Sequence, residues 1–149
     1  MTAILVIDDN EEVCRAVVSL LEPDGYVVHT AQRVEDGIQA LDDAQKAGKP
    51  YAVALVDMRF DNYAGSECER AIAGKQVMDA ALRVPFIEVI VVTAYGDTNG
   101  DVDLMEAGAF AYLRKGRGDA GMREMKLQVA RAVKYRALRK RADLDYRNP

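Results

Sequence analysis

The sequence predicts an α/β fold: one doubly wound domain in three layers, with a five-stranded parallel sheet between two layers of helices. Short apolar runs alternate along the chain with segments of helical periodicity, and turn residues separate them. Strands that alternate with helices of about 10 to 15 residues form βαβ units. Their right-handed crossovers give parallel strands that are covered on both faces.

The first expected strand shows why the sheet should be buried on both faces. Residues 3–7 read AILVI, and the run stops abruptly at Asp8, Asp9 and Asn10. A nearly continuous apolar run of this length is typical of a strand inside a parallel sheet. The other expected strands cover residues 26–31, 53–56 (ending at Asp57), 89–93 and 111–114.

Helices are expected between these strands. Asn10 is well placed to cap the first, because Val13, Val17 and Leu20 follow it at helical spacing. The residues PDG at 23–25 then supply a stop. The remaining helices are expected over residues 34–46, about 75–82, about 102–106, and from about residue 119 into an extended C-terminal helix.

Composition excludes several classes of protein. With 149 residues, half of them hydrophobic, the chain can bury one sizeable core and has little room for two. It shows neither a secretory leader nor an apolar run of about 18 residues, so we expect a soluble, cytoplasmic protein. Two cysteines and one histidine fit no disulfide framework or zinc pattern. The net charge of −4 gives no general attraction for nucleic acid.

Chemistry-bearing residues follow the expected strands at their carboxyl ends, where such sheets bind ligands. Asp8 and Asp9 follow the first strand, Asp57 the third, Thr93 the fourth and Lys115 the fifth. Three crowded carboxylates repel one another unless a cation neutralises them, and an all-oxygen set suits Mg²⁺. Asp57 could then serve as a nucleophile toward a phosphoryl group, with the Thr93 hydroxyl and the Lys115 amine around its oxygens.

Four segments in order, each at an expected strand end, resemble the response-regulator receiver family of two-component signalling. They are VIDD at 6–9, LVDM at 55–58, VVTAYGD at 91–97 and GAFAYLRK at 108–115. The resemblance covers about residues 3–135. It implies a flavodoxin-like strand order, 2-1-3-4-5, and a signalling domain that catalyses only its own phosphorylation and dephosphorylation.

The resemblance also implies a role for each site residue. Asp57 would be the phosphoacceptor, and Mg²⁺ would be held by Asp8, Asp9, Asp57 and the backbone carbonyl of Arg59. Thr93 and Lys115 would contact the phosphoryl group, and Tyr112 would turn inward as the aromatic switch residue. The implied partners are a histidine kinase or histidine phosphotransfer protein, and a downstream effector protein or output domain.

The chain departs from the family pattern at several positions. The glycine that normally opens the third helix matches Gly74, so residues 59–73 form a longer loop than the pattern expects. Gly116 follows Lys115 where the family prefers proline. Arg59 and Tyr95 are bulky at positions that flank the attacking water, which suggests slow hydrolysis of the phosphate.

Residues 1–135 are expected to form the receiver domain and residues 136–149 a polar helical extension or linker. Five basic residues between 134 and 141 indicate a solvated helix, with a linker or a homodimer contact as alternatives. Two other functions stay open. A pseudo-receiver would bind partners without phosphorylation, whereas an aspartyl-phosphate phosphatase would need a second acid where Arg59 stands.

Overall fold

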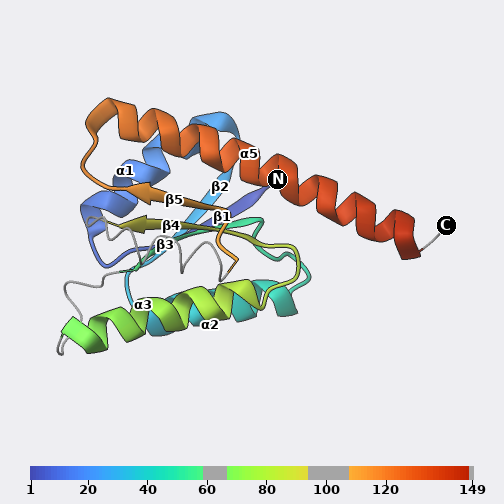
Figure 1. Ribbon diagram of the computed structural model, residues 1–149, viewed down its shortest axis with the longest axis horizontal. Helices are drawn as coiled ribbons and strands as arrows, with labels where there is room; N and C mark the ends of the chain where they lie inside the picture. The colour runs from blue at the N-terminus through green and yellow to red at the C-terminus, as the bar shows by residue number, and fades with distance from the viewer. Residues whose placement is uncertain (59–66, 94–107, 148–149) are drawn as a thin grey trace.

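The computed structural model describes residues 1–58, 67–93 and 108–147. It contains one parallel sheet in the order β2-β1-β3-β4-β5 (Figure 1). The predicted doubly wound α/β fold and its strand order are therefore confirmed. The chain adds β2 on one side of β1 and β3 on the other, so the order reverses between β1 and β3. The strands are β1 (Ala3–Ile7), β2 (Val27–Ala31), β3 (Val53–Asp57), β4 (Glu88–Thr93) and β5 (Ala111–Arg114).

Within the described residues, two pairs of helices cover the sheet (Figure 1). One face carries α1 and α5, and the other carries α2 and α3. A short 3₁₀ turn, η1 (Glu22–Asp24), follows α1. The α-helices in the described residues are α1 (Glu11–Leu21), α2 (Val34–Lys46), α3 (Glu67–Leu82) and α5 (Gly118–Arg147).

The central strands alternate their side chains between two cores. In β1, Ile4 and Val6 pack beneath α1 and α5, while Leu5 and Ile7 pack beneath α2 and α3. Neighbouring strands β3 and β4 divide their side chains in the same way. Burial of each such side chain stabilises the fold by about 1.5–3 kcal/mol, so both cores hold the strand ends in place. This two-sided burial explains the continuous apolar runs.

The predicted cap of α1 is confirmed. The side-chain oxygen of Asn10 accepts hydrogen bonds from the backbone N–H groups of Glu12 (2.9 Å) and Val13 (3.2 Å). These groups have no partner within the helix, so the cap satisfies two of them. The backbone N–H of Asn10 in turn donates to Asp8 Oδ1 at 2.9 Å. The start of α1 and the end of β1 are thereby fixed to one another.

The predicted start of the third helix was wrong. We expected it at about residue 75, but α3 begins at Glu67, so the second half of the expected 59–73 loop is helical. Gly74 therefore lies inside α3 and does not open it. Glycine in a helix interior costs only about 1 kcal/mol, which the surrounding helix-forming residues and the packing of α3 on the sheet outweigh. The helix expected at 102–106 lies outside the described residues.

Helix α5 has 30 residues, which makes it about 45 Å long. Its first half is anchored by Met125, Val129 and Ala132, which are buried against the sheet. Its last turns extend past the sheet toward the C-terminus (Figure 1). The expected boundary between residues 135 and 136 falls within this continuous helix.

An ion pair between an exposed arginine and a buried glutamate connects the later part of α5 to the sheet. Glu88, the first residue of β4, is 4% exposed and pairs with the guanidinium of Arg139. That guanidinium also lies 5.7 Å from the ring centroids of both Phe86 and Tyr135. Burial raises the pKa of Glu88, and the hydrogen bond from Arg139 opposes the rise. The pair thus offsets part of the free-energy cost of burying the Glu88 carboxylate.

Arg139→Ala should lower the free energy of unfolding by about 1–3 kcal/mol at pH 7, because a buried carboxylate loses its partner. Arg141→Ala, on the exposed part of the same helix, should change it by less than about 0.5 kcal/mol. Urea unfolding followed by circular dichroism measures both values. Equal effects of the two substitutions would show that the pair does not stabilise the fold.

The pH dependence of this deficit has a defined sign. Without Arg139 the pKa of Glu88 rises further, so the folded state binds a proton that the unfolded state releases above its pKa of about 4.5. Because the unfolded state is common to both proteins, the deficit should grow as pH rises above the raised folded-state pKa of Glu88 in the wild type, and shrink as pH falls below it. The double substitution Glu88→Gln with Arg139→Ala should remove this pH dependence.

Candidate functional site

The three predicted acids meet at the carboxyl end of the sheet. Asp8 directly follows β1, and Asp57 ends the neighbouring strand β3. Asp8, Asp9 and Asp57 each offer a carboxylate oxygen, and these atoms all lie within 4.8 Å of one another. Asp8 and Asp57 are each only 3% exposed, while Asp9 is half-buried. The parallel sheet therefore brings together acids that are 49 positions apart in sequence.

Lys115 reaches this cluster from the end of β5. Its Nζ lies 2.6 Å from Asp8 Oδ2 and 3.3 Å from Asp57 Oδ2. Its backbone N–H donates to the carbonyl of Thr93 at 2.7 Å, which fixes the start of the side chain. Burial lowers the pKa of the ammonium, but the hydrogen bond to Asp8 and the charge of Asp57 outweigh this, and the pKa is raised. Lys115 therefore stays cationic at neutral pH.

Thr93 and Tyr112 lie on the neighbouring strands β4 and β5. Thr93 is the last residue of β4, is 4% exposed and pairs in register with Arg114 of β5. Tyr112 lies in the middle of β5 opposite Val91, is half-buried and packs toward the α2 and α3 side of the sheet. The positions of both residues are thus compatible with the predicted roles.

Cys14 supports the site in a way that sequence reasoning missed. Its Sγ donates to the backbone carbonyl of Asp8 at 3.3 Å. Burial, followed by the charge of Asp8, raises the pKa of this thiol to about 11. Cys14 is therefore a neutral residue of the core beneath α1 that also holds the backbone of Asp8.

Some residues that the sequence singled out lie away from the acids or outside the described residues. Arg59 and Tyr95 lie outside the described residues, as does the side chain of Cys68. The described peptide bonds include no cis bond, and Gly116 has φ 78°, a left-handed conformation that glycine adopts readily. His29 is exposed on β2, opposite Leu5, and forms a hydrogen bond with the Tyr51 hydroxyl at 2.7 Å, so it lies away from the acids.

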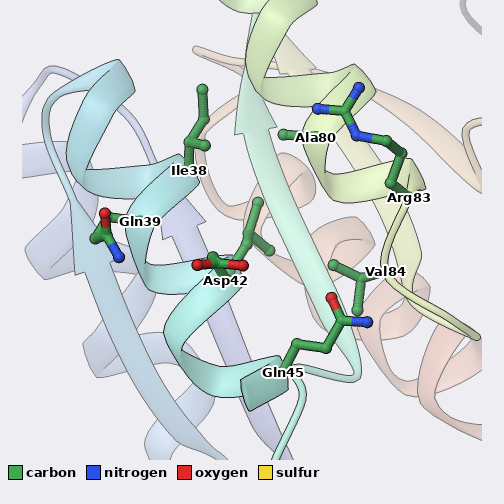
Figure 2. Close-up of a pocket in the computed structure, with 8 residues that line it drawn as sticks. Ile38, Gln39, Asp42, Gln45, Ala80, Arg83 and Val84 are labelled. Carbon is green, nitrogen blue, oxygen red and sulfur yellow. The ribbon is translucent and has the colours of Figure 1, made fainter. Parts of the chain in front are cut away.

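A hollow of about 250 Å³ lies between α2 and α3 (Figure 2). Ile38 and Asp42 of α2 line it, with Ala80 of α3 and Val84 just after it. Helix α2 ends before β3 begins and α3 ends before β4 begins, so these residues lie toward the amino ends of the strands. The hollow is therefore remote from the acids and forms no part of the candidate site.

The chain matches the family model of the response regulator receiver domain over residues 4–126. It belongs to this family. The receiver fold and the two-component signalling context that the sequence suggested are therefore confirmed. No described helix combines the length and apolarity that crossing a bilayer requires.

Individual relatives agree with this assignment. The response regulator GacA of Pseudomonas protegens is 32% identical over 134 residues, which are 89% of this chain and 55% of that protein. The photosynthetic apparatus regulatory protein RegA of Cereibacter sphaeroides is 28% identical over 113 residues, 76% of this chain and 54% of that protein. The chain thus spans about half the length of these regulators, which are signalling proteins.

Solved structures show the same fold. A receiver domain from Clostridium thermocellum has a TM-score of 0.71 and 25% identity, covering 93% of this chain and 98% of that one. A CheY-like receiver from Methanospirillum hungatei has a TM-score of 0.74 and 21% identity, covering the same shares of the two chains.

The chemistry of the acids fits the Mg²⁺ that receivers generally bind. The cluster offers only carboxylate oxygens, the ligand type that Mg²⁺ prefers. Lys115 already compensates part of the negative charge through Asp8 and Asp57. A divalent cation and Lys115 would therefore share the same carboxylates.

Lys115→Met should destabilise the metal-free protein by about 1–3 kcal/mol, because Asp8 and Asp57 lose a cation while remaining buried. Saturating Mg²⁺ should then stabilise the variant more than the wild type. Lys126→Met, which alters a half-exposed lysine of α5, serves as the control. Urea unfolding with and without Mg²⁺ measures the difference, and equal stabilisation of all three proteins would contradict this account.

Proposed function

We propose that this domain is a phosphoacceptor in a two-component system or phosphorelay, with Asp57 receiving a phosphoryl group from a phosphohistidine. The observation that carries the proposal is the convergence of three carboxylates within 4.8 Å, with Lys115 Nζ 3.3 Å from Asp57. Membership of the receiver family supports the same chemistry.

In the transfer step, a carboxylate oxygen of Asp57 forms a bond to phosphorus as the P–N bond to the donor histidine breaks. The histidine leaves with the electron pair and takes up a proton. The negative charge on the equatorial oxygens needs fixed positive groups and donors nearby. Lys115 supplies the charge, and the hydroxyl of Thr93, at the end of the next strand, supplies a hydrogen-bond donor.

Mg²⁺ would be held by Asp8, Asp9 and Asp57, with the backbone carbonyl of Arg59 as the proposed fourth protein contact. When bound, the ion supplies positive charge that offsets the carboxylates and the transferring phosphoryl group. Asp8 is kept in place for this role by Asn10 and Cys14, which bond its carboxylate and its carbonyl. Its position therefore does not depend on Lys115 alone.

The phosphorylated state would differ from the free state at Thr93 and Tyr112. Phosphorylation adds charge beside Thr93, and movement of its hydroxyl toward the phosphoryl group would open space for the Tyr112 ring. Tyr112 lies in β5, which packs against α5. The surface shared by β5 and α5 is thus the proposed place where an effector protein or output domain detects the change.

Asp57→Asn is the direct test of the phosphoacceptor. After incubation with acetyl phosphate and Mg²⁺, the wild type should gain about 80 Da, the mass of one phosphoryl group, and the variant should gain none. Intact-mass spectrometry measures both. Chelation of Mg²⁺ should abolish the gain, because the charge of the acids then opposes an incoming phosphate.

Other results would point to the alternatives. A wild-type protein that gains no mass would favour a pseudo-receiver that binds partners without phosphorylation. Rapid turnover of acetyl phosphate without an accumulating adduct would favour a phosphatase.

Thr93→Val tests the switch separately, because valine keeps the shape of threonine but lacks the hydroxyl. The variant should still accept a phosphoryl group at Asp57, at a reduced rate. Its Tyr112 ring resonances should shift on phosphorylation much less than those of the wild type, as measured by NMR. Equal shifts in both proteins would separate Tyr112 from Thr93.

A further inference from the structure

Gly74 makes an unusually close approach to the strand that carries Asp57. It is buried inside α3, and a Cβ atom added there would lie 2.3 Å from the carbonyl oxygen of Met58. The same atom would lie 2.8 Å from the carbonyl carbon and 2.9 Å from the Cα of Met58. Real Cβ atoms essentially never lie closer than 3.0 Å to a heavy atom of a residue that is not their neighbour in the chain. Any side chain at this position would therefore force a displacement.

The reason for glycine here is space and not backbone conformation. Gly74 is not among the glycines with positive φ, and it lies within a regular helix. The atoms that a Cβ would meet belong to the Met58 backbone, which cannot turn aside as a side chain can. Either α3 or the backbone after β3 would have to move.

Gly37 provides the contrast within the same layer of helices. It lies inside α2, and the three atoms nearest to a Cβ there would be side-chain atoms of Ile7, at 3.0–3.2 Å. Relief of this contact requires a shift of a few tenths of an ångström by the buried Ile7 side chain and not by a backbone segment. Both glycines are in helices that pack on the same face of the sheet, but only Gly74 contacts the backbone next to an acid of the site.

The contacted segment leads directly from the site. Met58 directly follows Asp57 in the chain. Asp57 is 3% exposed, so its carboxylate has little room to adjust if this backbone moves. A displacement of Met58 would pass through the connecting peptide bond to Asp57, one of the proposed ligands.

We propose that Gly74 is a positioning residue for the Mg²⁺ site. Its missing side chain lets α3 pack against the backbone of Met58, which in turn orients Asp57. The inference rests on the proposed function, because it assumes that Asp57 holds the ion. Gly74 touches neither the ion nor the phosphoryl group and acts through the backbone alone.

The test compares Gly74→Ala with Gly37→Ala in the full chain. Both substitutions place the better helix former inside a helix of the same layer, so differences in propensity cancel. Mg²⁺ affinity measured by isothermal titration calorimetry should fall roughly tenfold or more for Gly74→Ala, as when outer-shell support of a metal ligand is lost. It should stay near the wild-type value for Gly37→Ala. Urea unfolding without Mg²⁺ gives the stability of each variant separately.

Raising the Mg²⁺ concentration should restore phosphorylation of Gly74→Ala by acetyl phosphate, because the defect lies in holding the ion. Wild-type Mg²⁺ affinity in a folded Gly74→Ala protein would overturn the inference. A variant that stays unfolded even in a stabilising osmolyte with Mg²⁺ would also overturn it, and would make Gly74 a packing residue.

These outcomes are distinct from failure of the proposed function. If the wild type itself neither binds Mg²⁺ nor gains a phosphoryl group, the proposed function fails, and the Gly74 inference fails with it. If the wild type does both and Gly74→Ala matches it, only the inference about Gly74 is lost.

Discussion

The confinement of buried carboxylates at the end of the sheet is the constraint on which the rest of this structure depends. Asp8 and Asp57 are almost fully buried within 4.8 Å of each other and of Asp9, an arrangement that carboxylates avoid unless positive charge is close. Lys115 provides that charge through ion pairs to both buried acids. The arrangement is held by the sheet, because each acid and the lysine sits at or just beyond the end of a hydrogen-bonded strand. The energy that holds the site together thus comes from the apolar cores on both faces.

A buried acid that is paired with a basic side chain also occurs at the opposite, amino-terminal end of the strands. Glu88 begins β4 and is buried, and Arg139 of α5 pairs with it. Lys115 and Arg139 both belong to the C-terminal part of the chain, one just after β5 and the other late in α5. The C-terminal elements therefore neutralise buried acids at both ends of the strands.

Family membership accounts for the fold and the general chemistry, while three features belong to this chain. Helix α3 begins at Glu67, well before Gly74. Gly116 takes the place of a proline after Lys115, and the lysine nevertheless reaches the acids because Thr93 fixes its backbone. Helix α5 continues without interruption to Arg147. With all three features present, the acids and the lysine still meet at the carboxyl end of the sheet.

The sequence by itself determined the strands, their order of appearance and the residues at their carboxyl ends, because buried parallel strands have a continuous apolar pattern that stops sharply at polar residues. It therefore predicted Asp8, Asp57, Thr93 and Lys115 as neighbours. It did not determine where α3 begins, because the family pattern placed Gly74 at the opening of that helix and only the tertiary structure shows Gly74 in the interior. It also gave no sign of the Glu88–Arg139 pair, of the support of Asp8 by Cys14, or of the contact between Gly74 and Met58. These depend on distances between segments that are far apart or differently oriented, and only the tertiary structure decides them.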